Sequence, residues 1–469
     1  MEYSLLNPTS TGIIQEAIEK AMDMKRPLFL PIIATKPCFI KMASLIQAMT
    51  ASDIPFLLAN SNQHYDAALT AQIGEFGYKE QISVNLYSNG DDFNERITTM
   101  CQSVSAFLRT IASYSDKPDI IPVVSGDTFS AGILPQLFYF STGMRSVHIE
   151  AGLRSFGPAN KEAWLEGDFL HQAEWDWIRY VNDPFPEGMD SRLASINSEL
   201  LLAPVARNRH NLVCDGYDAS NIMITGSLSS DAVRQMRKYA STADFLSRYS
   251  FIAEGKWLRV DMHRRENLAP DKLIAVLKGI AKLSRAGMRV FLVKSNAMMA
   301  AIRHFGLEEQ LRLTEMAGVV ICDLWPSYLD VISFMLSDHC LGLYTDSGGL
   351  QEEAHILAVP CLTLRFSTDR PETILDAPGN LLLPPVSYNF IYNNVLRAFG
   401  RSSGSKLSPG KPSPGKPSPG KTSIDNPSRS IWKDPVSQNI YGSNVAESIV
   451  EKLRGYCPKA NAARRVFSY

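Results

Sequence analysis

"LYTDSGGLQEEAH", residues 343–355, decides the fold of this chain. An apolar strand comes first, two glycines (Gly348 and Gly349) follow, and a helical pattern then begins. A glycine turn at a helix start presents free backbone N–H groups and the positive end of the helix dipole, which together bind an anion. The missing side chains let a diphosphate approach closely, and Glu352 or Glu353, one turn later, is placed to accept hydrogen bonds from a ribose. The alternative is a tight turn with two solvated glutamates.

Short apolar runs alternate with longer amphipathic segments on both sides of this stretch. Such a pattern predicts α/β architecture, with parallel sheets covered by helices on both faces. We expect two Rossmann-like doubly wound domains, a hinge near 205–220, and a ligand cleft between them at the carboxyl ends of the strands. The expected strands are 27–35, 54–60, 119–126 and 146–152 in the first series and 221–226, 256–262, 289–295, 318–324, 340–346 and 360–366 in the second.

These runs divide the chain into expected domains, and two other segments stand out. The inserted segment 157–183 carries Trp164, Trp175 and Trp177 and should be ordered, either as a helix packed in a surface groove or as a lid that forms a substrate wall. "LSPGKPSPGKPSPGKTS" belongs to a low-complexity linker, because a Pro/Gly/Ser/Lys repeat cannot build a core. The expected parts are a helical extension (1–26), an N-terminal domain (27–210 with 439–469), a C-terminal nucleotide-binding domain (211–399) and the linker (400–438).

Composition bounds the class of protein. The 469 residues are 45% hydrophobic and 20% charged, and 47 basic residues against 48 acidic ones give a net charge of −1. These are ordinary globular values without the charge excess of a nucleic-acid or membrane surface. The seven cysteines are scattered without a CxxC pair, which favours free thiols in a reducing compartment. No signal peptide and no apolar run of roughly 20 residues is evident, so we expect a soluble cytoplasmic protein with no metal site.

Charged residues follow several of the expected strands and should gather at the cleft. Basic residues there suit a phosphate or its departing oxygen, and paired carboxylates suit acid/base chemistry. Solvated basic loops, neutralisation by Glu266, Asp369 or Glu372, and helix capping by Asp127 or Thr128 are the plainer alternatives. The basic residues are Lys36 and Lys41 in "ATKPCFIKMA", His263, Arg264 and Arg265 in "VDMHRRENL", and Arg365 and Arg370 in "RFSTDRPETI"; the carboxylates are Asp127 in "SGDTFS", Glu150 in "HIEAGLRS" and Glu187 in "PFPEGMDSR".

Taken together and in this order, the motifs resemble those of the UDP-N-acetylglucosamine 2-epimerase family, of the non-hydrolysing bacterial kind. The family pattern runs GTRPE-x-IKMAP, TGQH, GDT, HVEAGLR, PEE-x-NR, T-x-HR-x-EN, TDSGG-x-QEE and TERPE, and ends in NPYGDG. The corresponding stretches here are "ATKPCFIKMAS", "SNQHYD", "SGDTFS", "HIEAGLRS", "PEGMDSR", "MHRRENL", "TDSGGLQEEA", "STDRPE" and, after the linker, "NIYGSNVAESIV".

The resemblance implies a GT-B fold with a C-terminal helix crossing back to the first domain, a homodimer, and no cofactor. It also implies elimination of UDP across C1–C2 of a UDP-HexNAc and re-addition through a 2-acetamidoglucal with C2 inverted, which supplies nucleotide sugar for cell-surface polysaccharide. On this basis the catalytic residues are Asp127, Glu150, Glu187 and His263, and the UDP-sugar ligands are Lys36, Lys41, Arg265, Ser347, Gly348, Gly349, Glu353 and Arg370.

Several positions depart from the family pattern, mostly on the sugar side. Lys36 replaces the arginine of GTRPE and loses its bidentate fork, and Cys38 replaces the glutamate that follows. Further departures are Gly188 for the second glutamate of PEE, Ser191 for the arginine (or its displacement to Arg192), Ser227 for the asparagine of TGN, and some two dozen extra residues in the inserted segment. These departures suggest an altered sugar, bounded by the inserted segment.

Three other functions remain open at this point. A hydrolysing relative would release UDP and free N-acetylmannosamine, although such enzymes read GDR and HIHGGE where this chain has "GDT" and "HIEAGLR". A GT-B glycosyltransferase would use the same UDP site and form a new glycoside. An inactive UDP-sugar-binding regulator would bind UDP without turnover.

Overall fold

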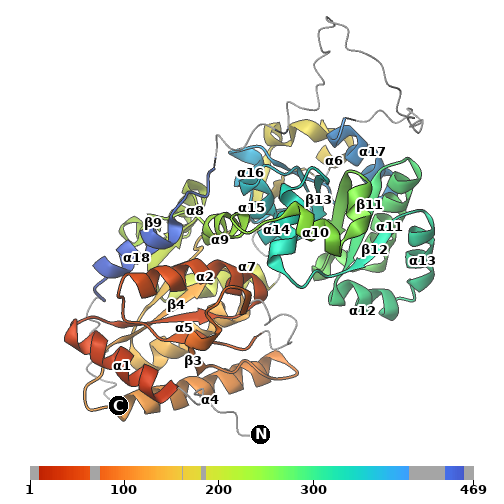
Figure 1. Ribbon diagram of the computed structural model, residues 1–469. Coiled ribbons are helices and arrows are strands. Elements are labelled where there is room, and N and C mark those ends of the chain that lie inside the picture. The colour runs from red at the N-terminus through yellow and green to blue at the C-terminus, as the bar shows by residue number, and fades with distance from the viewer. Residues whose placement is uncertain are drawn as a thin grey trace, which may run out of the picture.

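The computed structural model describes residues 10–63, 74–160, 162–180, 186–400, 432 and 439–458. Two parallel sheets with helices on both faces form two domains (Figure 1), as the sequence predicts. The first sheet has seven strands in the order β3-β2-β1-β4-β5-β8-β9, and the second has six in the order β12-β11-β10-β13-β14-β15. Both are fully parallel, so the functional groups that follow the strands of one sheet meet at a single edge.

The first domain is built on near-continuous apolar strands. β1 is buried at all six positions, which is expected for a central strand with helices on both sides. Its strands are β1 Leu28–Ile33, β2 Leu58–Asn60, β3 Ile82–Asn85, β4 Ile120–Ser125, β5 Ser146–Ile149, β8 Ser198–Ala203 and β9 Ile222–Ile224. Its helices are α1 Ser10–Asp23, α2 Lys36–Ala51, α4 Phe93–Ala112, α5 Phe129–Thr142, α7 Glu187–Ile196, α8 Ala206–Cys214 and α18 Val445–Gly455, with 3₁₀ turns at Lys79–Gln81 and Ala219–Asn221.

The second domain repeats this plan. Its strands are β10 Trp257–Asp261, β11 Arg289–Lys294, β12 Val320–Asp323, β13 Cys340–Thr345, β14 Cys361–Thr363 and β15 Asn380–Leu382. Its helices are α9 Leu228–Arg237, α10 Thr242–Arg248, α11 Pro270–Arg285, α12 Asn296–His304, α13 Glu308–Met316, α14 Tyr328–Leu336, α15 Gly348–Ile356, α16 Glu372–Leu375 and α17 Tyr388–Ala398, with 3₁₀ turns at Ser250–Glu254 and Arg265–Asn267.

One predicted boundary is wrong. The sequence pattern assigns the strand expected at 221–226 to the second series and puts the domain boundary between residues 210 and 211. In the structure this strand is β9, which pairs in parallel with β8 at the edge of the first sheet. The chain therefore leaves the first sheet only after Ile224, because a short apolar run extends an existing sheet as readily as it begins a new one.

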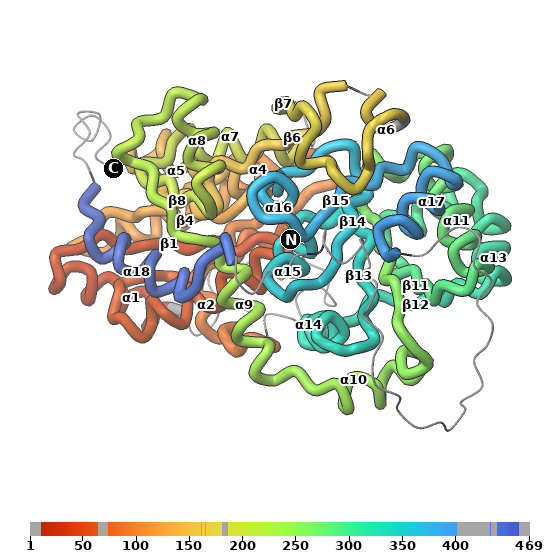
Figure 2. Tube along the Cα trace, turned by 90° about the horizontal axis from the view of Figure 1, so that it is seen from above, coloured from red at the N-terminus to blue at the C-terminus, as the bar shows by residue number. Residues whose placement is uncertain are grey.

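The end of the described chain returns to the first domain. Helix α18 lies along α2 in the view of Figure 2, and the two helices are in contact. The ring of Tyr456, just after α18, lies 6.1 Å from that of Phe29 in β1. The predicted crossing helix is thus confirmed. The repeat of the linker (400–438) lies outside the described residues, and so do residues 1–9 of the N-terminal extension.

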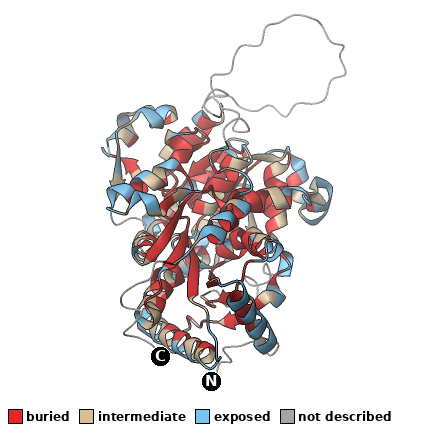
Figure 3. Cartoon of the chain, turned by 90° about the vertical axis from the view of Figure 1, so that its left-hand side faces the viewer, coloured by how far each residue is buried: buried red, intermediate tan, exposed pale blue. Residues whose placement is uncertain are grey.

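The domains share a continuous core. One cluster of buried side chains runs from β1 and α2 through α9 to α14 and α15 in the second domain, and Figure 3 shows buried residues extending through both sheets. Within the described ranges no helix is both long and apolar enough to cross a bilayer.

The inserted segment forms a hairpin that reaches across to the second domain (Figure 2). It is not a single helix: β6 (Ser155–Pro158) pairs antiparallel with β7 (Trp177–Tyr180), and the short helix α6 (Ala163–Glu166) and a 3₁₀ helix (Phe169–Glu174) lie between them. Trp164 packs on Ile374 and Leu382 of the second domain, with Trp175 and Trp177 beside it. The Gln172 side chain is fully buried and exchanges two 2.8 Å hydrogen bonds with the backbone of Leu382 in β15.

Candidate active site at the domain junction

The site begins where β13 turns into α15. Ser347 caps the helix, its Oγ accepting from the N–H of Leu350. A Cβ at Gly348 would lie 3.1 Å from Asp369 Oδ2 and 3.7 Å from Arg264 Nη2, whereas a Cβ at Gly349 would meet no atom closer than 3.9 Å. The helix start therefore offers bare backbone beside a cation, the arrangement that an approaching diphosphate requires.

Arg264 is the cation closest to this turn. Its guanidinium donates from Nε to the Asp346 carbonyl at 3.0 Å, and its Nη1 lies 3.8 Å from Glu187 of the first domain. Burial works against the charged form, but Asp369 and Glu187 outweigh it and raise the pKa of Arg264. Arg264 therefore carries a fixed positive charge between the two domains.

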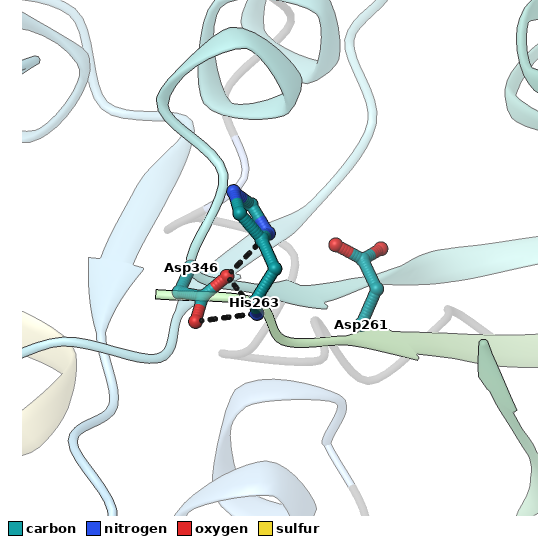
Figure 4. Close-up of side chains that lie close together, drawn as sticks. All are labelled: Asp261, His263 and Asp346. Atoms are coloured by element: carbon teal, nitrogen blue, oxygen red, sulfur yellow. Dashed lines mark hydrogen bonds and ion pairs between the residues drawn. The ribbon is translucent and has the colours of Figure 1, made fainter. Parts of the chain in front are cut away.

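His263 precedes Arg264 and pairs with the buried carboxylate of Asp346 (Figure 4). The ring Nδ1 lies 3.0 Å from Asp346 Oδ1, and the carboxylate also accepts from the backbone N–H groups of His263 and Arg264. Burial opposes charge on both partners, yet the pairing raises the pKa of His263 and lowers that of Asp346 to about 2. The imidazolium is thereby favoured, with its side chain about half exposed at 48%.

Asp261 lies near this pair and completes a His/Asp group within 4.8 Å, the spacing of metal ligands. Its carboxylate is already used, since it accepts from Thr345 Oγ1 at 2.6 Å and from Arg259 Nε at 3.1 Å. With Asp346 similarly engaged, the group is explained as a hydrogen-bonded charge cluster.

Arg370 lies in a buried ion network on the second-domain side. It pairs with Glu352 through Nε and with Asp369 through Nη1 at 2.8 Å, while Arg365 holds the other Asp369 oxygen at 2.5 Å. Burial alone would raise the pKa of Asp369 and that of Glu352, but the neighbouring cations lower both.

Lys41 links this network to the first domain. It lies at the first turns of α2, with its Nζ 2.5 Å from Glu150 Oε1 and 3.3 Å from Glu352 Oε2. Glu150 follows β5 with φ of 63°, a left-handed conformation that is costly for a non-glycine residue and typical of functional sites. Burial raises the pKa of Glu150 although Lys41 opposes the shift. One lysine thus holds a carboxylate from each domain.

Two further carboxylates, Asp127 and Glu187, line one pocket at the junction. Thr128, rather than Asp127, caps α5, its Oγ1 accepting from the N–H of Ala131 at 3.2 Å, so Asp127 is left for the pocket. Burial raises the pKa of Asp127 and that of Glu187. Asp190, one turn after Glu187 in α7, has a pKa raised to about 7 by burial and by these two neighbours.

Lys36 of α2 and Glu353 of α15 lie close enough to interact electrostatically. Burial lowers the pKa of Lys36, as does the charge of Arg259, whereas Glu353 raises it. Glu353 is buried, and burial raises its pKa to about 7 although Lys41 opposes the shift. A carboxyl that titrates near neutrality is therefore present where the sequence predicts a ribose acceptor.

The structure brings most of the predicted residues together, with one exception. Arg265 is exposed and, in the residues described, forms no ion pair or hydrogen bond with the others, so its role as a ligand stays a prediction. Arg264 occupies the site instead, because its extended backbone before the 3₁₀ turn directs its N–H and Nε to Asp346. The sequence predicts Glu352 as an alternative ribose acceptor and Asp369 as a neutralising partner, and the structure places both in the ion network of Arg370. Sequence reasoning left out Asp190.

Comparison with known proteins agrees with this arrangement. The family model for UDP-N-acetylglucosamine 2-epimerase matches residues 179–410. Proteins named UDP-N-acetylglucosamine 2-epimerase from Methanocaldococcus jannaschii and Bacillus subtilis are 26% and 28% identical to the chain. These matches cover 75% and 79% of this chain and 87% and 86% of the two proteins.

Solved structures show the same fold. The UDP-GlcNAc 2-epimerase from Methanocaldococcus jannaschii, in complex with UDP-GlcNAc and UDP, has a TM-score of 0.67 at 21% identity and covers 92% of this chain and 100% of that one. The enzyme from Neisseria meningitidis bound to UDP-GlcNAc has a TM-score of 0.68 at 19% identity, with the same coverage. The GT-B-like architecture is therefore shared. Motifs, fold and sequence similarity agree, and the chain belongs to the UDP-N-acetylglucosamine 2-epimerase family.

Proposed function

We propose that this protein is a UDP-N-acetylglucosamine 2-epimerase of the non-hydrolysing type, an isomerase that inverts C2 of a UDP-HexNAc. The observation that carries the proposal is the pairing of two features across the domain junction. Gly348 and Gly349 open a helix beside Arg264, and Asp127 and Glu187 both line the adjoining pocket. The first feature suits a departing diphosphate and the second suits proton transfer at the sugar.

The proposed reaction divides between the two domains. UDP binds through Lys36, Lys41, Ser347, Glu353 and Arg370, with Arg264 in place of Arg265. A carboxylate of the first domain removes the C2 proton while the C1–O bond breaks. The electron pair of the C1–O bond leaves with UDP. The backbone N–H groups of α15 and the charges of His263, Arg264 and Arg370 stabilise the diphosphate.

Inversion requires proton removal from one face of C2 and delivery to the other. Asp127 and Glu187 come from different elements, and each has a raised pKa, so each can hold a proton in one half of the cycle. Glu150 is held by Lys41, and its role is to place that lysine and supply a third carboxyl. UDP then re-adds at C1 of the 2-acetamidoglucal, and the product serves polysaccharide synthesis.

The experiment that tests this proposal is proton NMR of UDP-GlcNAc incubated with the protein in D₂O. We expect UDP-ManNAc with deuterium at C2, because the base exchanges its proton with solvent. Free UDP with N-acetylmannosamine would favour the hydrolysing alternative. A new glycoside would favour a transferase, and UDP binding without any exchange would favour an inactive regulator.

We also propose a homodimer in a reducing compartment. The helices α5 and α7 pack against each other and expose Phe140 (73%), Met189 (60%) and Ile196 (58%). Phe129 extends this stripe and lies 5.1 Å from the exposed Phe93 of α4. A second copy of the chain would cover this apolar face and remove it from water. The seven cysteines are all free, which fits a reducing compartment such as the cytosol. Sedimentation of wild type and Phe140→Asp tests the dimer, which the substitution should dissociate.

A further inference from the structure

Two arginines pair with one carboxylate where the inserted hairpin meets the first domain, and a third arginine lies near them. Asp215, just after α8, accepts from Arg154 Nε at 3.0 Å and Nη2 at 2.6 Å, and its other oxygen lies 2.6 Å from Arg179 Nη2. Arg192 of α7 has no ion pair within the described residues, and its Nε is buried without a hydrogen-bond partner. The Nε of Arg179 is likewise buried without a hydrogen-bond partner. The cluster therefore carries more positive than negative charge.

The cluster shows signs of this imbalance. Burial lowers the pKa of Arg154, and Arg179 and Arg192 lower it further, while Asp215 opposes them. A buried guanidinium with unused N–H groups is costly unless an anion accepts from it. An anionic ligand at this point would satisfy those groups.

The cluster opens into the pocket of the proposed active site. Arg154 and Arg192 line that pocket together with Asp127 and Glu187. Ser155 also lines it, and its Oγ is buried without a hydrogen-bond partner. A ligand group that enters the pocket beside the two carboxylates can therefore contact a guanidinium and a hydroxyl.

The acidic wall of the pocket does not cancel this excess. Asp369 is held by Arg365 and Arg370, and Glu187 faces Arg264. Asp127 takes up a proton more readily than usual, since burial raises its pKa. The unmatched charge in the pocket is therefore the positive charge at Arg192.

The residues beside Arg192 in the pocket lining are small. Gly188 has no side chain and Ser191 has a short one. Tyr180 of the inserted hairpin lines the same pocket. Neither Gly188 nor Ser191 therefore places a bulky side chain beside Arg192.

We propose that the preferred substrate carries a carboxylate on its sugar, bound by Arg192 and Ser155, so that the substrate class is a UDP-N-acetylhexosaminuronic acid. This inference rests on the proposed function for the position of the UDP. A carboxylate accepts a forked pair of hydrogen bonds from a guanidinium, which a hydroxymethyl group cannot do.

The test compares the dissociation constants of UDP-GlcNAc and UDP-N-acetylglucosaminuronic acid by calorimetry. We expect the carboxylated sugar to bind at least about tenfold more tightly to the wild-type protein, an effect in the range of a charge-assisted hydrogen bond. Arg192→Gln should abolish the preference, Arg192→Lys should keep part of it, and Arg237→Gln, at an exposed arginine of α9, should keep all of it. Thermal unfolding of each variant checks that it folds.

Equal or weaker binding of the carboxylated sugar by wild type would overturn the inference, and so would a preference that survives Arg192→Gln. Exchange of the C2 proton in D₂O, measured in parallel, separates the two proposals. Exchange with UDP-GlcNAc but no binding preference would leave the epimerase standing without the carboxylate subsite. A binding preference without C2 exchange of either sugar would support the carboxylate subsite and overturn the epimerase.

Discussion

Glu353 is a buried carboxyl placed where a ribose is expected, and burial raises its pKa to about 7. Only the ionised form accepts from both ribose hydroxyls. An acid with a raised pKa is protonated below that pKa, so UDP affinity should rise as the pH increases through about 7 and then level off. Calorimetric titrations with UDP on either side of neutrality measure this effect.

Glu353→Gln should bind UDP about 10–100-fold more weakly above pH 7, the value of a hydrogen bond to a charged group, and should lose the pH dependence. Glu372→Gln is the matched control, because Glu372 is also buried with a pKa near 7 but bonds to Tyr441. A pH dependence that persisted in Glu353→Gln would assign the titration to another group.

Asp127 is the residue whose role is most directly tested by substitution. Asp127→Asn keeps the shape and removes the base, so C2 deuterium exchange should fall by roughly 10²–10⁴-fold. UDP affinity should change little, because the diphosphate contacts lie on the other domain. Asp271→Asn, at an exposed position of α11, should leave exchange unchanged. Unchanged exchange in Asp127→Asn would transfer the base role to Glu187 or Glu150.

At this scale the sequence predicted which residues gather at the junction but not every contact among them. Strand ends and glycines predicted the positions of Asp127, Glu150 and Gly348, because backbone periodicity determines which edge of a sheet they reach. The contacts of Arg264 are different, since its backbone N–H and its Nε donate to Asp346, about 80 residues away in sequence. The alternation of strands and helices does not predict such a tertiary contact.

The inserted hairpin shows the same limit for a whole element. Its tryptophans predict an ordered segment, either a helix packed in a surface groove or a lid, and the structure shows a hairpin in place of the helix. Trp164 packs on Ile374 and Leu382, and Gln172 bonds to the edge strand β15. These partners lie about 200 residues further along the chain, so tertiary contacts rather than local propensity decide the conformation.

The hairpin should keep the two domains closed over the reaction intermediate. Trp164→Ala removes a side chain that is only 8% exposed and should cost about 3 kcal/mol of stability. Free UDP and 2-acetamidoglucal should then accumulate, because the cleft opens more often. Denaturant unfolding and NMR of the products measure both effects. Tyr239→Ala, at a 65% exposed aromatic residue, should show neither, and a destabilised Trp164→Ala that releases no intermediate would limit the hairpin to a packing role.

For the whole molecule, the sequence predicted two sheets and the crossing helix but misplaced the boundary between the domains. The apolar residues of β9 do not specify which strand pairs with it, so the sequence pattern alone does not assign β9 to the first sheet. Pairing with β8 and the contact of α9 with both α2 and α15 tie the two halves together. The boundary is thus a property of long-range packing, and the same is true of the charges buried across it.

Lys41 should hold the two domains together through its carboxylate partners, Glu150 and Glu352. Lys41→Met fills a similar volume but leaves two buried acids facing each other, which should cost about 3–5 kcal/mol and separate the domains. Urea unfolding measures the first effect and the radius of gyration from small-angle scattering measures the second. Lys278→Met, at an exposed position of α11, is the control. Adding Glu150→Gln to Lys41→Met removes one of the unpaired charges and should restore part of the loss, whereas a merely additive double variant would show that Lys41 acts through packing.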